Sequence, residues 1–185
     1  MPPRALFLSR LRAALAPFCV MAVLGPQAFG IEAGPSAIKA AFLYKFGFFV
    51  EWPSAAFAAS DSPINLCIVG GDPFGAVLDD TVKGRRIGDR SIAVRRLEAA
   101  TRQSGCHIVF LAAGRSADET LAALRGSDVL TVTDSRPQGD RVGIINFVMQ
   151  DNRVRFDIDD AAAASGGLTI SSRLLNLALD VKPRN

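Results

Sequence analysis

Residues 64–75 have the sequence Ile-Asn-Leu-Cys-Ile-Val-Gly-Gly-Asp-Pro-Phe-Gly. The run Ile64–Val69 is mostly apolar, and a short apolar run that ends at glycines is typical of a buried strand. Asp72 and Pro73 then predict the start of a helix, because a carboxylate caps free N–H groups and proline fits the first helical position. We expect this helix to end near Gly84.

The alternation of short strands and helices continues along the chain. Strands are predicted at Ser91–Leu97, Cys106–Leu111 and Asp128–Thr133, and a helix capped by Ser116 separates the last two. Apolar strands that alternate with helices favour a parallel sheet covered on both faces. The predicted fold class is therefore α/β, a single three-layer domain with a mainly parallel, doubly wound sheet plus a C-terminal antiparallel hairpin.

The hairpin is predicted from a change of pattern near the C-terminus. Gly143–Met149 and Arg153–Ile158 are separated only by residues typical of a turn, and polar and apolar residues alternate in the second run. This combination predicts two antiparallel strands with one face in solvent. A short helix over 161–164 and a last helix that contains Leu174 follow, and Asp134–Arg141 before the hairpin is predicted to be a surface loop.

A phenylalanine stripe marks the first helix, predicted over Ser36–Val50. Phe42, Phe46 and Phe49 recur at helical spacing, and such a stripe is more often core than binding face. The wide apolar face leaves three further side chains as candidates for a dimer or partner contact: Leu43, Phe48 and Trp52.

The N-terminus has the features of an export signal. Three arginines precede an apolar run over residues 13–25, and a small-x-small cleavage site follows at 28–30. An uncleaved membrane anchor is the alternative, but a spanning helix needs about 20 apolar residues. We therefore predict a signal peptide at 1–30, a single domain at 31–185 and a periplasmic location.

The charge balance argues against nucleic acid as a partner. The chain has 21 Lys+Arg and 18 Asp+Glu. The predicted signal peptide contains three of these arginines and no acid, so its removal leaves 18 residues of each sign. No nucleic-acid-binding motif is present. Association with a protein partner or a second copy of the chain is easy for a near-neutral protein.

Two cysteines, Cys67 and Cys106, remain after removal of residues 1–30. An even number in an oxidising compartment favours a disulfide, and two buried thiols in apolar strands are the alternative. The bridge would close a loop of about 40 residues and contribute up to about 4 kcal/mol to the free energy of unfolding.

The sequence offers few groups for catalysis. The single histidine, His107, lies in an apolar strand, where a packed or hydrogen-bonded ring is commoner than a general base, and no nucleophile-elbow sequence is present. Spacing typical of metal ligands is also missing. The turn at Gly70-Gly71 lacks the spacing of a dinucleotide-binding loop, so a capped turn is favoured over a phosphate site. We predict no enzyme activity, no metal and no cofactor.

Several stretches of the chain are notable for their order and spacing. They are Ile38–Phe46 with Phe49–Pro53, Cys67–Gly70 with Asp72–Gly75, Cys106–Phe110, and Gly143–Phe147 through Arg153–Ile158 to Ile170–Leu175. Together they cover nearly all of residues 31–185 and resemble the YfiR family of periplasmic proteins.

The resemblance implies a regulator that acts by contact. The best-known member of the family is a periplasmic repressor that binds the sensor domain of a membrane-anchored diguanylate cyclase, and an outer-membrane lipoprotein can draw it away. Related domains attached to sensor kinases make a kinase the other partner class. The resemblance also places the family's stabilising disulfide at Cys67 and Cys106, whereas no cysteine follows Cys106 to form the second bridge of some members.

Two functions are therefore considered. The first is repression of the periplasmic domain of a membrane diguanylate cyclase, which lowers cyclic-di-GMP and biofilm formation. The alternative is a periplasmic small-ligand-binding sensor module for a kinase or transport system, with a crevice near Gly70-Gly71, 113–115 and Thr133-Asp134. The candidate partner or ligand contacts are Trp52, Arg115, Arg153, Arg155, Arg173 and Leu174.

Overall fold

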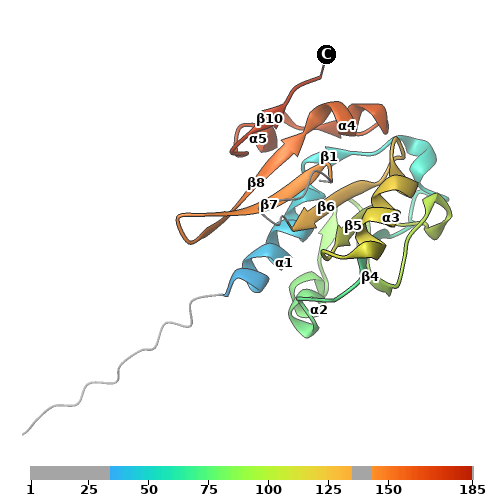
Figure 1. The fold of residues 1–185 in the computed structure, drawn as a ribbon. Helices are drawn as coiled ribbons and strands as arrows, with labels where there is room; N and C mark the ends of the chain where they lie inside the picture. The colour runs from blue at the N-terminus through green and yellow to red at the C-terminus, as the bar shows by residue number, and fades with distance from the viewer. Residues whose placement is uncertain (1–33, 135–142, 185) are drawn as a thin grey trace, which may run out of the picture. The chain divides into compact units, whose positions relative to one another are not determined.

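An eight-stranded sheet forms the centre of the computed structural model, which describes residues 34–134 and 143–184 (Figure 1). Its strands are β2 (Ile64–Val69), β3 (Arg86–Ile87), β4 (Arg90–Leu97), β5 (Ile108–Leu111), β6 (Leu130–Asp134), β7 (Ile145–Gln150), β8 (Arg153–Asp159) and β10 (Val181–Lys182). Their spatial order is β10-β8-β7-β6-β5-β2-β4-β3.

Five adjacent strands, β4-β2-β5-β6-β7, are parallel. In chain order this is the doubly wound arrangement 2-1-3-4-5, whose switch point lies between β2 and β5. β8 runs antiparallel to β7, and β3 runs antiparallel to β4. The predicted fold class, a mainly parallel α/β sheet with a C-terminal hairpin, is confirmed.

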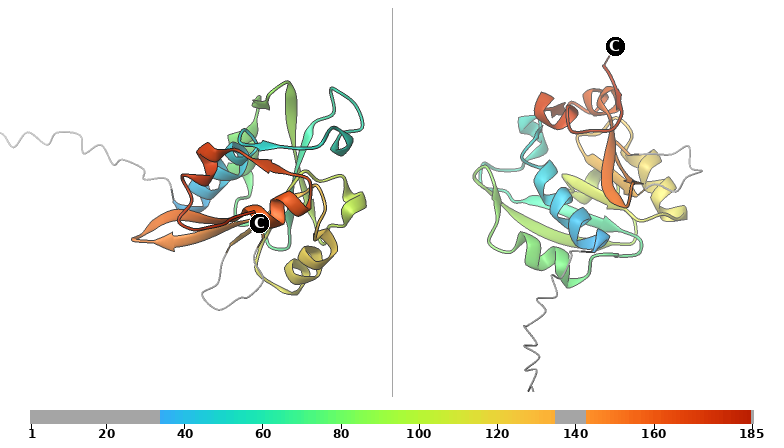
Figure 2. Two further views of the ribbon diagram at one scale, coloured as in Figure 1. Left: turned by 90° about the horizontal axis from the view of Figure 1, so that it is seen from above. Right: turned by 90° about the vertical axis from the view of Figure 1, so that its left-hand side faces the viewer.

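Helices cover both faces of this sheet (Figures 1 and 2). α1 (Pro35–Phe46) and α2 (Ala76–Val82) pack on one face, and α3 (Arg115–Leu124) packs on the other. After the hairpin come α4 (Asp160–Ser165) and α5 (Ser172–Leu175). A separate two-stranded sheet joins β1 (Val50–Glu51) to β9 (Thr169–Ile170). Two short 3-10 helices, η1 (Ser54–Ala56) and η2 (Arg102–Ser104), lie in the connections before β2 and β5.

The phenylalanine stripe packs into the core, as predicted, although only Phe46 is fully buried and Phe49 lies beyond the end of α1. Phe46 is 1% exposed, and its ring lies 5.2 Å from that of Phe156 and 5.7 Å from that of Phe147. Phe42 and Phe49 pack against the same cluster. The prediction that Leu43 is a partly exposed contact is wrong, because this side chain faces the core and is fully buried.

The predicted hairpin is also present, and its turn explains its register. Asp151 and Asn152 both have positive φ, 48° and 57°, as a two-residue type I′ turn requires. This turn matches the twist of the flanking strands and places Val148 opposite Arg155 and Phe147 opposite Phe156.

Several predicted boundaries differ from the structure. β5 begins at Ile108 rather than Cys106, and β6 begins at Leu130 rather than Asp128. α1 ends at Phe46 rather than Val50, because Val50 leaves the helix to pair with Ile170 in the small sheet. α2 begins at Ala76 rather than Pro73, because Asp72 stabilises a turn before the helix. Ser116 lies inside α3, which begins at Arg115.

Two predictions fall outside the described residues. These are the signal peptide at 1–30 and all of the surface loop Asp134–Arg141 except its first residue. None of the helices between residues 34 and 184 that the structure describes has both the length and the apolar character to cross a membrane.

Candidate functional site

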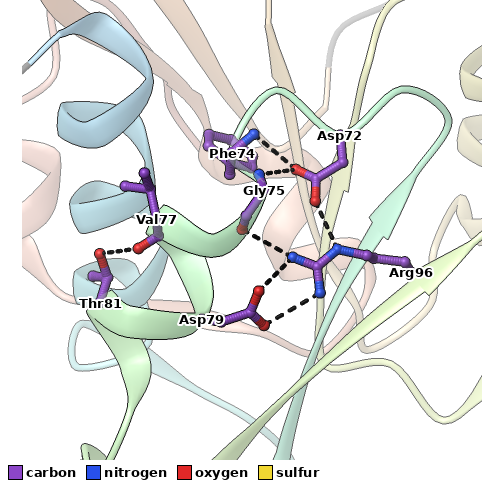
Figure 3. A network of polar contacts seen from close by, with 7 residues as sticks. All are labelled: Asp72, Phe74, Gly75, Val77, Asp79, Thr81 and Arg96. Carbon is purple, nitrogen blue, oxygen red and sulfur yellow. Dashed lines mark hydrogen bonds and ion pairs between the residues drawn. The ribbon is translucent and has the colours of Figure 1, made fainter.

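The carboxyl ends of β2 and β4 are joined by a polar network centred on Arg96 (Figure 3). Parallel pairing aligns Arg96 with Ile68, so its side chain reaches the turn after β2. Its guanidinium donates to Asp72 Oδ2 and Asp79 Oδ2, both at 2.7 Å, and to the Gly75 carbonyl at 3.0 Å. The hydrogen bonds to Asp79 and Asp72 raise the pKa of Arg96 above its ordinary value. The network therefore fixes the turn, α2 and β4 together.

Asp72 completes this network on the turn itself. Its Oδ1 accepts the N–H groups of Phe74 and Gly75 at 2.8 and 3.1 Å. Although partial burial raises the pKa of Asp72, these hydrogen bonds and the contact with Arg96 hold it below its ordinary value. Because Asp72 occupies the N–H groups that a phosphate would need, this is a capped turn rather than a phosphate site.

The crevice predicted at the switch point between β2 and β5 is narrow. A Cβ placed on Gly70 would lie 3.6 Å from both Ala112 Cβ and Ser116 Oγ. At the next strand, Asp134 forms an ion pair with Lys39 of α1, with Nζ and Oδ2 2.7 Å apart. Arg115, a predicted contact, is exposed at the start of α3 beside this edge.

At the opposite, amino edge of the sheet, His107 holds the segment that precedes β2. Its Nδ1 accepts the Asn65 N–H at 3.0 Å, so Nε2 carries the proton and donates to the Ala56 carbonyl at 3.1 Å. Phe57 stacks on the ring at 4.5 Å. Burial lowers the pKa of His107 below its ordinary value. His107 is thus a hydrogen-bonded core histidine, in agreement with the prediction.

Trp52, another predicted contact, lies beside His107. Its indole N–H donates to the His107 carbonyl at 3.3 Å, and the two rings meet edge to face. The side chain is half-buried, so only part of it is available to a partner.

A disulfide joins Cys67 and Cys106, as predicted. Cys106 lies two residues before β5, yet the Cα atoms are 5.9 Å apart, a separation that a disulfide spans readily. The bridge ties β2 to the segment that enters β5.

The hairpin presents a polar row on one face. Arg153 and Arg155 are exposed, Asp157 is half-buried, and alternation along β8 places all three side chains on the same face. Burial, with the nearby charge of Asp180, raises the pKa of Asp157 above its ordinary value. The end of the hairpin extends beyond the helical layers (Figures 1 and 2).

The remaining predicted contacts do not join this row. Arg173 is exposed on α5, whereas Leu174 is 2% exposed and belongs to the main core. The prediction of Leu174 as a contact residue is therefore wrong. A short amphipathic helix has one buried side, and the sequence alone did not show which leucine lies on it.

Sequence reasoning also missed the roles of Lys39, Asp79 and Arg96. The alignment of β2 with β4 is the signal that could have placed Arg96 beside the turn, but it depends on strand pairing. Among residues 34–134 and 143–184, no group of three or more His, Cys, Asp or Glu side chains is placed to hold a metal ion.

The described geometry contains a disulfide-linked doubly wound sheet with an added hairpin, and the YfiR/HmsC-like sequence model matches residues 36–179. The chain belongs to the YfiR/HmsC-like family. No curated protein matches the sequence. Membership of this family indicates a periplasmic, non-catalytic regulator in cyclic-di-GMP signalling that interacts with the periplasmic sensor domain of a membrane protein.

Proposed function

We propose that this YfiR/HmsC-like protein binds and represses the periplasmic sensor domain of a membrane-anchored diguanylate cyclase, and so lowers cyclic-di-GMP and biofilm formation. The match of the family over residues 36–179 carries the proposal. A sensor kinase is the other partner of the same kind. An outer-membrane lipoprotein that withdraws the repressor, and a homodimer, complete the proposed set of interactions.

The polar row of the hairpin is the proposed contact with the sensor domain. Arg153 and Arg155 point to solvent, and neither forms an ion pair with any residue that the structure describes. Two free guanidinium groups favour an acidic patch on the partner, and such charges affect mainly the rate of association and the orientation of the complex.

Repression then follows from differential affinity. The protein stabilises the inactive state of the sensor domain only to the extent that it binds this state more tightly than the active one. A shift of the cyclase from mostly active to mostly inactive, 99:1 to 1:99, requires a ratio of about 10,000 between the two affinities.

Gene deletion tests the proposal. Loss of the protein should raise cyclic-di-GMP and surface attachment, and the wild-type gene should restore both. Arg155→Glu should restore them poorly because it reverses a charge of the row. Lys45→Glu reverses an exposed charge on α1 and should act as wild type. Unchanged cyclic-di-GMP after deletion would contradict repression of a cyclase.

A groove between α3 and α4 supports the alternative, a small-ligand-binding module. It has a volume of about 650 Å³, within the roughly 300–1,000 Å³ of small-molecule sites, and Leu121, Arg125, Thr131 and Ala162 are among its lining residues. Tight binding of a small metabolite to the purified protein, together with unchanged cyclic-di-GMP in the deletion strain, would favour this function.

We also propose that residues 1–30 are removed on export and that 31–185 fold as a single domain. The intact mass of the protein from a periplasmic fraction tests the cleavage. A mass that still includes Met1 would contradict it.

A further inference from the structure

The outer edge of β4 is open along most of its length. On one side β4 pairs with β2 over Ile92–Leu97. On the other side β3 covers only Arg90 and Ser91. Within the part of the chain that the structure describes, no strand pairs with the outer side of β4 beyond Ser91.

Alternation identifies the backbone groups on this open side. The Leu97 carbonyl accepts the Gly70 N–H on the β2 side, so odd-numbered residues of β4 face β2. Ile87 and Arg90 flank a two-residue turn and are therefore the hydrogen-bonded pair of this hairpin, which agrees with even-numbered residues facing outward. The N–H and C=O groups of Ile92, Val94 and Arg96 therefore point to the open edge.

A groove runs along this edge. It has a volume of about 580 Å³, with Ser91, Ile92 and Val94 of β4 on one wall. The opposite wall comes from the end of α2 and the connection to β3, and includes Asp79, Asp80, Val82, Lys83 and Arg85. An edge strand beside a helix is the arrangement in which an extended peptide adds to a sheet, with its backbone on the strand and alternate side chains in the groove.

The charges along the edge favour an acidic occupant. Residues 79–98 contain basic side chains at 83, 85, 86, 90, 95 and 96 and acids at 79, 80, 89 and 98, and Asp79 is already paired with Arg96. Antiparallel pairing of β4 with a second copy of itself would bring these cations together, which is unfavourable. Lys83 and Arg85 are exposed and form no ion pair with a described residue, so they can meet carboxylates.

We propose that the open edge of β4 binds an extended, acidic segment of a partner protein as an added strand. β4 and β8 lie toward opposite ends of the sheet order. The protein can therefore hold this segment while the hairpin contacts a sensor domain. The inference does not depend on the identity of that sensor domain, because strand addition is measured with the purified protein alone.

The probe is a synthetic peptide with alternating glutamate and valine or threonine, acetylated and amidated at its ends. Its counterpart has lysine in place of every glutamate. Titration calorimetry should show the acidic peptide binding at least about tenfold more tightly than the lysine peptide. Hydrogen exchange by NMR should show slower exchange of the Ile92, Val94 and Arg96 amides in the complex, because a new strand covers them.

A proline substitution tests whether the open edge of β4 is the binding site. Val94→Pro removes one outward N–H, and strands tolerate proline where the N–H faces an open edge. We expect this variant to bind the acidic peptide at least about tenfold more weakly. The matched control is Val154→Pro. The backbone groups of Phe156 and Ile158 bond to the C-terminal segment, so alternation along β8 turns the Val154 N–H to the same side, where no strand covers it among the described residues. This control should bind the peptide as wild type.

Charge reversal gives a second variant in case Val94→Pro fails to fold, as judged by circular dichroism and melting temperature. Lys83→Glu/Arg85→Glu should weaken binding by at least about tenfold. Equal binding of the two peptides, undiminished binding by both variants, or a dimer of this chain that Val94→Pro abolishes would overturn the proposal. None of these outcomes alters the cyclic-di-GMP result of gene deletion, so the two proposals fail separately.

Discussion

The two faces of the sheet are stabilised by different interactions. Under α1 and α2 the core is aromatic, and Phe46 lies within 6 Å of Phe42, Phe147 and Phe156 by ring centroids. Under α3 the buried side chains are smaller, and the Cys67–Cys106 disulfide lies among them. The face without large aromatic contacts is thus the one that is crosslinked, and the disulfide there adds to the contribution of a smaller apolar core.

The largest effect is expected on the aromatic face. Phe46→Ala removes a fully buried ring and leaves a cavity among three other rings, so it should lower the free energy of unfolding by about 3–5 kcal/mol. Urea denaturation measures this change. Phe48→Ala is the matched control, because Phe48 is 49% exposed and its loss should change stability little. A wild-type melting temperature in Phe46→Ala would contradict the burial of the stripe.

A somewhat smaller effect is expected on the crosslinked face. Cys67→Ala/Cys106→Ala should lower the free energy of unfolding by about 2–4 kcal/mol, because the bridge no longer restricts the unfolded chain. A reducing agent should destabilise the wild type by a similar amount and leave the double variant unchanged. Equal stability of oxidised and reduced wild type would show that this face does not need its crosslink.

The sequence predicted the main elements of both faces, but not where every element ends. The strand Ile64–Val69 and the Phe42–Phe46 stripe were correct because apolar periodicity is local. The disulfide followed from the number of cysteines and the predicted compartment. In contrast, the end of α1 depends on the pairing of Val50 with Ile170, which lies 120 positions away in the chain, and no local pattern encodes it.

The candidate sites were harder to predict for the same reason. Asp72 is a favourable helix cap by local rules, but Arg96, on another strand, holds its carboxylate at the preceding turn. Local periodicity also did not separate Leu174, which is core, from an exposed leucine such as Leu177. The strands β1, β3, β9 and β10 have two residues each, too few for a period to be recognised.

His107 gives a third prediction, because its buried ring bonds two backbone groups at the amino edge of the sheet. Its folded-state pKa is lowered by burial, so the unfolded chain takes up a proton more readily. The contribution of His107 to the free energy of unfolding should therefore be constant above about pH 6.5–7 and fall as the pH drops from about 6.5 toward the folded-state pKa. The physical cause is that a protonated ring no longer accepts the Asn65 N–H.

Urea denaturation at pH 7.5 and 5.5 tests this sign. His107 is the only histidine of the chain, so no other imidazole contributes to the difference. His107→Gln should be less stable at pH 7.5 but should show little change between the two pH values. A loss of stability between pH 7.5 and 5.5 that is no larger in the wild type than in His107→Gln would contradict the neutral, hydrogen-bonded ring.

The smallest expected effect is the coupling between the two faces. Phe46 and Cys67 belong to separate buried clusters on opposite sides of the sheet. Effects of distant, independent sites usually add to within about 0.3–0.5 kcal/mol. Phe46→Leu is mild enough to keep the fold, so its effect can be measured with the disulfide intact and again after reduction. If the faces are independent, the two values agree within that limit. A difference well above about 0.5 kcal/mol would show that β2, which carries side chains to both faces, transmits strain from one core to the other.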